Sequence, residues 1–535
     1  MKKLIVFAGI LWCASQVFAG GLLTNGNQSA QYIRMLSRNA STDVDAVYFN
    51  PAGLMLMNNG FYITIQNQSL FQTKSVQSGF PLLSNGKYDG TLTAPIFPTA
   101  YAVYKKEKFA LSLGFGPNYG GGSAEFDRGL PSFEKDISKL VPGLGGLKSF
   151  GQNVTGYSTD IYFKGESVFW GIQGGASVKI NKIFSVYGGL RYVPATNKYT
   201  GHISNIQLNV NGQLQNAATF LKGEATALQG IQDQVTYAAG SVEQLITQGG
   251  GGYTLAQVQG AGYITAGDRA ALTQGLNQIG IPTTQVDQMN ISQIHGAFNA
   301  VANAINGQPA KLNGIADQVG DKQVDVTQTG AGVTPIIGVS ISPVKNLNIG
   351  IKYEFMTKLT LTNSTKVDGT AKFPDKKKTS SDVPALFSIG ADYKLSKFSF
   401  SLSFNAYNDK GVDWGINVYG EPRVIDHNTW EVAAGLQYQV TKKFALSAGY
   451  LRTEMGVFPQ FQSDFSYYNN TANTFGGGLE FKLNPKFTID LGALYTKYED
   501  AKKPFIDQTF GNYTETYSKH NLGFAIGLGY RFGGI

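Results

Sequence analysis

The feature that most constrains the fold is an alternation, in steps of two, between large apolar residues and small or polar ones. From Leu522 to Phe532 every even-numbered residue is large and apolar, and the odd-numbered residues between them are Gly, Ala or Arg. The same pattern starts again near residues 347, 398 and 430. A period of two places successive side chains on opposite faces of a β-strand. The chain is therefore predicted to form a sheet with one apolar face.

The lengths and connections of these segments distinguish two kinds of sheet. A soluble β-sandwich also alternates, but its strands are usually about five or six residues long. The segments here run for roughly 10 to 14 residues, and short turns bearing Lys or Asn alternate with long polar connections, as in outer-membrane barrels. The short turns lie at 105–108, 181–182, 345–346, 396–397, 442–443 and 484–486.

Counting the segments predicts an all-β fold, a fourteen-stranded antiparallel transmembrane β-barrel over residues 60–532. Closure leaves no sheet edge exposed to hydrocarbon. An even number of strands places both ends of the barrel on the short-turn side, the periplasm. The predicted strands are 60–74, 96–105, 107–117, 166–180, 183–203, 332–344, 346–362, 384–395, 397–408, 429–441, 443–453, 473–484, 486–498 and 519–532.

Composition excludes several other classes of protein. Charged residues make up 15% of the 535-residue chain, against about 25% in a typical soluble domain. Aromatic residues make up 12%, so intrinsic disorder is not expected. Beyond the first 20 residues there is no run of about 18 apolar residues, which excludes a helical membrane protein. The formal net charge of +8 is mild and dispersed, so no nucleic-acid partner is predicted.

The first residues have the pattern of a secretory signal peptide. Lys2 and Lys3 precede an apolar stretch from residue 4 to 18, and the small Ala19 completes a cleavage site. An N-terminal membrane anchor is the alternative, but the apolar run is short for one. We predict a signal over 1–19 that is removed after Ala19. The only cysteine, Cys13, would leave with it, so the mature chain is expected to have no disulfide and no thiolate site.

Residues 206–331 break the alternation. Apolar residues there recur at steps of three, four or seven, as from Leu221 to Leu245 and from Ile291 to Ile305. Such spacing predicts amphipathic helices that need to bury one stripe. By the alternation of sides this insertion is expected to be extracellular. It either packs on itself as a helical cap or covers the barrel mouth and offers apolar surface to ligands.

The segment 20–59 precedes the first strand and is not strand-like. A barrel of fourteen strands has a lumen that leaks unless something fills it, and a segment tethered at the base of the first strand could fold inward as a plug. This segment contains Asn50-Pro51-Ala52-Gly53, directly after Asp45-Ala46-Val47-Tyr48-Phe49. It resembles the N-terminal hatch of the FadL family of outer-membrane transporters for long-chain fatty acids and other hydrophobic compounds.

The resemblance implies a mechanism and a set of functional residues. A hydrophobic ligand would be captured at the surface, pass the hatch, and leave sideways through an opening in the wall at the third strand. In this sequence the third strand ends in Gly114, Gly116 and Pro117, and glycine and proline weaken strand pairing. The alternative is that Gly116-Pro117 only begins the next loop. Two departures from the family are the long 206–331 insertion and the three residues after Phe532.

Strand parity places a set of charged residues on the lumen side: Arg191, Lys352, Glu354, Asp392, Lys394, Glu431, Glu480, Lys482, Asp490 and Arg531. Most are expected to form a mixed-sign network that stiffens the barrel. Arg191 and Lys352 are also the candidates for contact with a ligand carboxylate, since a guanidinium matches its geometry. No residues have the spacing of a catalytic, metal or cofactor site, so the chain is not expected to be an enzyme.

Three functions fit these features of the sequence. The leading one is hatch-gated uptake of hydrophobic molecules, such as fatty acids or aromatic hydrocarbons, by a monomer embedded in outer-membrane lipid and lipopolysaccharide. The second is surface adhesion through the helical insertion. The third is a diffusion porin for polar solutes, which the predicted plug argues against.

Overall fold

The computed structural model describes residues 24–414, 424–459, 462–464 and 470–532. The predicted signal over 1–19 and the last three residues lie outside this range. The chain divides into two compact units, one of residues 1–143, 160–203 and 322–535 and one of residues 144–159 and 204–321. Among the described residues, no helix is long and apolar enough to cross a membrane.

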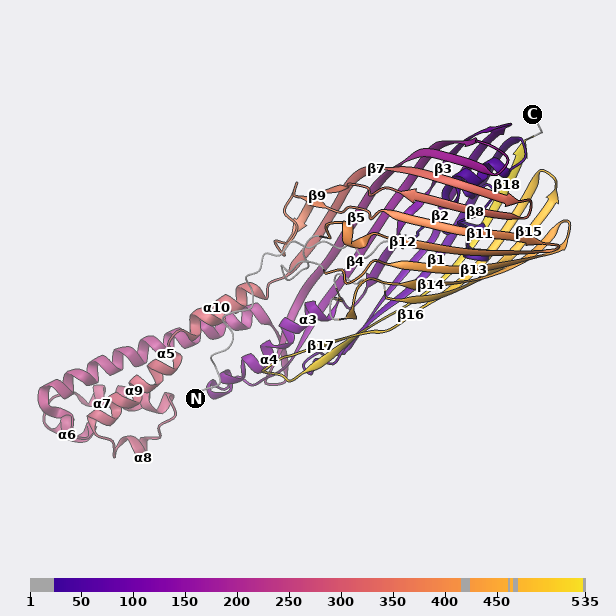
Figure 1. Ribbon diagram of the computed structural model, residues 1–535. Helices are drawn as coiled ribbons and strands as arrows, with labels where there is room; N and C mark the ends of the chain where they lie inside the picture. The colour runs from indigo at the N-terminus through magenta and orange to yellow at the C-terminus, as the bar shows by residue number, and fades with distance from the viewer. Residues whose placement is uncertain (1–23, 415–423, 460–461, 465–469, 533–535) are drawn as a thin grey trace. The chain divides into compact units, whose positions relative to one another are not determined.

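The first unit is a closed antiparallel barrel of fourteen strands, as predicted, when short strands that continue a longer one are not counted separately (Figure 1). The last strand pairs with the first from Phe61↔Phe532 to Ser78↔Glu515, which closes the ring. Three barrel strands are extended by short separate strands: β9 follows β8, β10 precedes β11, and β17 follows β16. The short β6 forms a hairpin with β5. The strands are β1 (Gly60–Ser78), β2 (Lys87–Lys106), β3 (Phe109–Phe126), β4 (Val154–Lys179), β5 (Phe184–Val210), β6 (Gln213–Asn216), β7 (Lys322–Val344), β8 (Leu347–Glu354), β9 (Thr360–Asp368), β10 (Lys378–Ser380), β11 (Leu386–Leu395), β12 (Phe398–Tyr407), β13 (Trp430–Thr441), β14 (Phe444–Glu454), β15 (Ala472–Asn484), β16 (Phe487–Tyr498), β17 (Ala501–Phe505) and β18 (Tyr513–Phe532).

Several strands are longer than predicted, always at the end away from the short turns. β4 begins at Val154 rather than 166, and β5 and β7 stay paired from Phe184↔Ile341 to Ile203↔Lys322. The helical stretch is correspondingly narrower than 206–331, since β5 runs to Val210 and β7 starts at Lys322. In these extensions the outward positions are polar, as with Lys87, Asp89, Thr91 and Thr93 of β2, so the apolar outer face is lost while backbone pairing continues.

The outer face of the barrel is apolar, as the alternation predicted. Along β18, Leu522, Phe524, Ile526 and Leu528 are exposed, while Ala525 between them is buried. Other strands expose Leu113, Ile172, Leu190, Ile337, Leu402, Val432 and Phe475 in the same way. A surface this apolar is stable only against hydrocarbon, so the barrel is a membrane-spanning one.

The second unit is helical and has a core of its own. Buried residues of five helices, among them Val242, Val258, Leu276, Ile294 and Phe298, form one cluster. The apolar stripes therefore pack on one another. The helices are α5 (Ala217–Leu245), α6 (Leu255–Gly260), α7 (Ala266–Gln278), α8 (Thr283–Val286), α9 (Ile291–Ile305) and α10 (Gln308–Gln318), with a π-turn, η3 (Ile246–Gly250), after α5.

The rest of the chain also contains short helices, some between strands and some ahead of β1. Between β3 and β4 lie α3 (Pro131–Ser138), α4 (Leu140–Gly143) and η2 (Gly145–Phe150), and η4 (Asp409–Gly411) follows β12. Ahead of β1, residues 24–59 form α1 (Ala30–Met35), α2 (Ala46–Phe49) and η1 (Pro51–Leu56). We call residues 24–59 the hatch.

Candidate functional site

The hatch lies inside the barrel, as predicted. All six residues of α1 and all four of α2 are buried. Its backbone approaches the wall so closely that side chains are excluded there: a Cβ added at any of several inward-facing glycines would meet hatch atoms. These are Gly350, Gly390, Gly435, Gly449, Gly476, Gly478, Gly492 and Gly527. The glycines that alternate with large apolar residues therefore form the seat of the hatch.

Helix α1 is held to the wall by a buried ion-pair cluster. The Arg34 guanidinium contacts Glu480 at 2.9 Å and Asp490 at 3.0 Å, and it also donates to Ser447 at 2.7 Å. Gln31 donates to the same Asp490 at 2.7 Å. Removing one member of such a buried cluster leaves an uncompensated charge, which is strongly destabilising.

A second ion-pair cluster lies within the hatch itself. Arg38 donates to both carboxylate oxygens of Asp45, at 2.6 and 2.7 Å, and to Asp43 at 2.8 Å. Burial alone would lower the pKa of Arg38, but the neighbouring Asp45 and Asp43 carboxylates raise it above its ordinary value. Arg38 therefore stays charged and holds the turn between α1 and α2 in a fixed shape.

The motif Asn50-Pro51-Ala52-Gly53 is buried at the turn after α2. The Asn50 amide donates to the Ser41 carbonyl at 2.9 Å, and a Cβ at Gly53 would collide with that same amide. The carbonyls of Pro51 and Ala52 accept from Ser177 and Ser185 on the wall, at 2.7 and 2.8 Å. Asn50 and Gly53 therefore shape the turn through their residue types, and Pro51 and Ala52 fix it to β4 and β5 through their backbone carbonyls.

The candidates Arg191 and Lys352 meet at Tyr48 of the hatch. The Arg191 guanidinium stacks 4.5 Å from the Tyr48 ring and forms a bidentate pair with Glu354, at 2.5 and 3.0 Å. Lys352 donates to Glu354 at 2.6 Å and to the Tyr48 carbonyl at 2.9 Å. This is the mixed-sign network that parity suggested, with a hatch residue at its centre.

All three nitrogens of Arg191 are engaged within the protein, since Gln173 accepts from Nε and Nη2 and Asn118 from Nη1. A ligand carboxylate would have to compete with Glu354 for either cation. Contact between Arg191 or Lys352 and a ligand therefore stays a prediction. Burial raises the pKa of Tyr48 above its ordinary value, so its hydroxyl remains a neutral donor, and it donates to Asn118 at 2.9 Å.

Backbone pairing between β2 and β3 is interrupted over one stretch, which we call the gap. Ala100 pairs with Phe115, and the next ladder pair is Thr91 with Glu125, so the described residues of 92–99 and 116–124 form no ladder pair with each other. β3 remains paired to β4 throughout, with shifts at Pro117 and Gly120. Gly114 still pairs with Tyr101 of β2, one residue before pairing stops at Phe115. Gly116 and Pro117 lie in the gap. The strand continues to Phe126, so Gly116-Pro117 does not begin a loop.

Prolines on both strands explain the gap, since proline has no backbone donor for the ladder. β3 contributes Pro117, and β2 contributes Pro95 and Pro98. Asn67 of the neighbouring strand β1 replaces part of the missing pairing: its side chain donates to the Pro95 carbonyl at 3.0 Å and accepts from the Phe97 amide at 2.9 Å. These bonds satisfy backbone groups that would otherwise be unpaired in hydrocarbon.

Aromatic side chains from three strands meet at the gap. Trp170 of β4 stacks on Phe115 with centroids 5.1 Å apart, and it meets Phe97 edge-on at 5.1 Å. On the inner side Asn118 accepts from Tyr48, and its carbonyl accepts from the Gly26 amide at 3.0 Å. The hatch is therefore bonded directly to the unpaired part of β3.

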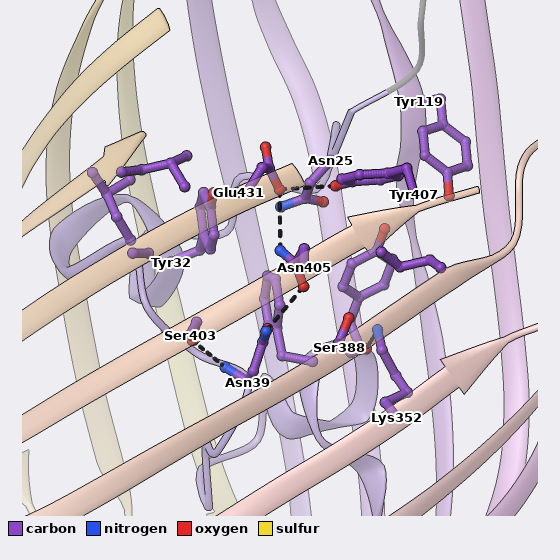
Figure 2. Close-up of a pocket in the computed structure, with 16 residues that line it drawn as sticks. Asn25, Tyr32, Asn39, Tyr119, Lys352, Ser388, Ser403, Asn405, Tyr407 and Glu431 are labelled. Atoms are coloured by element: carbon purple, nitrogen blue, oxygen red, sulfur yellow. Dashed lines mark hydrogen bonds between the residues drawn. The ribbon is translucent and has the colours of Figure 1, made fainter. Parts of the chain in front are cut away.

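A small cavity of about 20 Å³ lies between the hatch and β8, β11, β12 and β13 (Figure 2). Its lining mixes apolar residues such as Leu36 and Phe49 with many polar ones. Glu431 accepts from Asn405 at 3.0 Å and from Tyr407 at 2.9 Å, and Asn39 of the hatch donates to Asn405 at 2.9 Å (Figure 2). With the hatch in this position, a cavity of this size has room for about one water molecule.

The closed ring, the apolar exterior and the inserted hatch define the class of plugged outer-membrane β-barrels. The structure of a Pseudomonas aeruginosa FadL homologue is similar, with a TM-score of 0.56 and 14% identity over 96% of this chain and all of that chain. A TodX deltaS2S3 mutant, a monoaromatic hydrocarbon channel, has a TM-score of 0.51 and 12% identity, covering 94% of this chain and 99% of that one. The resemblance to the FadL family is thus confirmed at the level of the fold. No family model and no curated protein matches the chain.

Two parts of the site were not found from the sequence. The prolines of β2 could have been found, because Pro98 lies within the predicted strand 96–105 and Pro95 lies directly before it. Proline is rare inside strands. Glu431 was placed on the lumen side by parity, but nothing in the sequence distinguished it from the other lumen carboxylates. Its neighbours come from strands whose register only the fold defines.

Proposed function

We propose that this protein takes up hydrophobic small molecules across the outer membrane, with the hatch controlling a sideways exit through the gap between β2 and β3. The observation that carries the proposal is Asn118. It lies in the unpaired part of β3 and accepts from Tyr48, while its backbone holds Gly26. Movement of the hatch would therefore change the wall at the gap.

Physical chemistry supports a lateral exit. Each methylene removed from water gains about 0.8 kcal/mol. A long-chain molecule that crossed a water-filled pore would lose most of that gain. A route past Phe97 and Trp170 into the bilayer would keep the chain against apolar groups where it leaves the wall. No chemical step is needed, so we propose a transporter and not an enzyme.

The ligand class, the setting and the assembly are also part of the proposal. The two similar structures are a FadL homologue and a monoaromatic hydrocarbon channel, which supports long-chain fatty acids and aromatic hydrocarbons as candidate ligands. Residues 1–19 would direct export and be removed after Ala19. The barrel would work as a monomer surrounded by outer-membrane lipid and lipopolysaccharide, with the helical unit on the extracellular side.

Uptake by whole cells tests the function. Cells that make the protein should accumulate labelled oleate, or labelled oleyl alcohol, several-fold faster than cells that lack it, because the protein offers an apolar path through the outer membrane. The amount of folded protein in the outer membrane is measured in parallel. Unchanged uptake of both compounds at a normal protein level would contradict transport and favour adhesion through the helical unit.

Deleting the hatch separates this proposal from a diffusion porin. The intact barrel should conduct little in a planar bilayer, because the hatch fills the lumen. The same barrel without residues 24–58 should conduct strongly. A high conductance of the intact protein would favour the porin and contradict hatch control.

A further inference from the structure

Exposed lysines gather at one end of the barrel. The six short turns alternate with the long connections and so lie at the same end, and their bounds are 106–109, 179–184, 344–347, 395–398, 441–444 and 484–487. Each of these turns carries at least one exposed lysine. We call these residues the lysine ring: Lys106, Lys108, Lys182, Lys345, Lys397, Lys442, Lys443 and Lys486.

The short turns contain almost no negative charge. Glu107 is the only acidic residue within them. The long connections at the other end differ, since charges of both signs follow one another there, as in Glu134-Lys135-Asp136. Over the described part of the chain, no lysine of the ring forms an ion pair. Like charges that are crowded together repel, so a negatively charged partner would stabilise the ring.

Three basic side chains at the same end face inward and are bonded within the protein. Lys105 donates to the Asn59 side chain at 3.2 Å, and Arg531 donates to the Asn59 carbonyl at 2.9 Å. Lys482 pairs with Glu480 at 3.1 Å. The lysine ring has no internal counter-ion of this kind among the described residues, so a counter-ion for it would come from outside the protein.

Aromatic rings place the lysine ring at the membrane surface. Four of its lysines are each followed directly by a phenylalanine: Lys108-Phe109, Lys397-Phe398, Lys443-Phe444 and Lys486-Phe487. Phe398 and Phe444 each contact an aromatic ring of the neighbouring strand, with centroids 4.9 and 4.8 Å apart. Aromatic belts of membrane barrels lie at the level of the lipid head groups, and one residue spans only about 3.3 Å of a strand. The ammonium groups, on long flexible stems, can therefore reach the phosphates of the surrounding lipids.

A lipid surface fits this arrangement better than a soluble acidic protein. The ring is spread over all six turns, whereas a protein partner needs one continuous patch of about 800 Å². The phosphates of a leaflet meet the barrel on every side, and lysine is a common phosphate ligand. We propose that the lysine ring binds anionic phospholipids of the leaflet at the short-turn end, which the strand count predicts to be the periplasmic one. This inference goes beyond the proposed uptake and does not depend on it.

Competition between two lipids tests the inference. The purified full-length barrel is incubated with neutral-detergent micelles that contain dioleoyl phosphatidylglycerol and dioleoyl phosphatidylcholine in equal amounts. The lipids that stay bound after gel filtration are quantified by mass spectrometry. The two lipids share their acyl chains, and only phosphatidylglycerol has a net negative charge. It should be enriched roughly tenfold or more at about 0.1 M salt, the effect of a few lysines near a phosphate. The enrichment should be much smaller at about 1 M salt, because screening is stronger.

Two matched quadruple variants locate the effect. The ring variant removes four charges from three neighbouring turns and should lower the enrichment at least about threefold: Lys397→Gln, Lys442→Gln, Lys443→Gln and Lys486→Gln. The control variant removes four exposed lysines outside the ring and should leave the enrichment unchanged: Lys148→Gln, Lys311→Gln, Lys376→Gln and Lys378→Gln. The heat-dependent gel mobility of folded barrels checks each variant. If the ring variant does not fold, Lys442→Gln/Lys443→Gln takes its place, with a smaller decrease expected.

The outcomes decide between a lipid surface and other partners. Equal retention of the two lipids by the wild type overturns the inference and favours a soluble acidic partner for the ring. The same enrichment in the folded ring variant as in the wild type also overturns it, because the preference would then arise elsewhere on the barrel. A decrease in the ring variant with no change in the control supports it. Uptake is not measured in this experiment, so each outcome leaves the proposed function as it stands.

Discussion

Gly476→Val should unseat the hatch and give a barrel that conducts ions steadily. A Cβ at position 476 would collide with the Ile33 carbonyl and lie 2.9 Å from the Leu36 side chain. Overpacking of this kind costs typically about 1–3 kcal/mol and is relieved by moving the neighbour. The neighbour here is the backbone of the hatch, so the added side chain should push the hatch away from the wall. Planar-bilayer conductance measures the result.

Gly477→Val is the matched control for this experiment. Gly477 is the next residue on β15 and faces outward, where the nearest atom to an added Cβ is the Ser447 carbonyl oxygen at 3.4 Å. The same side chain is thus added on the other face of one strand, and this variant should stay closed. Equal conductance of the two folded variants would show that the seat of the hatch does not depend on these glycines.

A disulfide across the gap should abolish uptake. In the structure a Cβ at Gly122 would lie 3.3 Å from the Cβ of Ala94, close to the roughly 3.5–4.5 Å that a disulfide requires. Oxidation of Ala94→Cys/Gly122→Cys would join β2 to β3 in the middle of the unpaired segment. Uptake of the labelled compounds should fall to background and return on reduction. The positive φ of Gly122 strains a side chain there by about 1–2 kcal/mol, equally in both redox states.

A second cysteine pair controls for cross-linking itself. Ala102 and Leu113 face each other in the paired part of the same two strands, so Ala102→Cys/Leu113→Cys joins a wall that is already closed. Uptake should not change when it is oxidised. Cys13 is the only native cysteine and lies in the predicted signal, so no other thiol is expected to compete. Normal uptake through an oxidised Ala94→Cys/Gly122→Cys barrel would exclude the gap as the exit.

Much of the barrel was predictable because its cause is local. The apolar face, the strand number and the short turns follow from a period of two and from turn residues. The strand extensions, such as the first part of β2, were missed because their outward positions are polar and lack the large apolar residues that marked the other strands. The inner position of the hatch followed from its place before the first strand and from the resemblance of Asn50 to Gly53.

The site was less predictable because its contacts join distant residues. Parity assigns Glu354 and Glu480 to the lumen but does not give their height along the barrel or their partner. The partner of Glu480 is Arg34 of the hatch, and that of Glu354 is Arg191, two strands away. The gap arises because the β2 segment that contains Pro95 lies opposite the β3 segment after Pro117. Predicting it therefore requires knowing the register of β2 against β3.

The span of the hatch contacts along the chain has a consequence for biogenesis. Gln31 is bound to Asp490, 459 residues later, and Ala30 to Gln66 on the strand that β18 must reach to close the ring. The leading segment is synthesised first, yet its binding site exists only when the last strand is in place. Contacts so far apart form late, because the intervening chain must be ordered first. The hatch is therefore enclosed at the same step in which the barrel closes. A chain truncated before β18 should neither close the barrel nor bind its hatch.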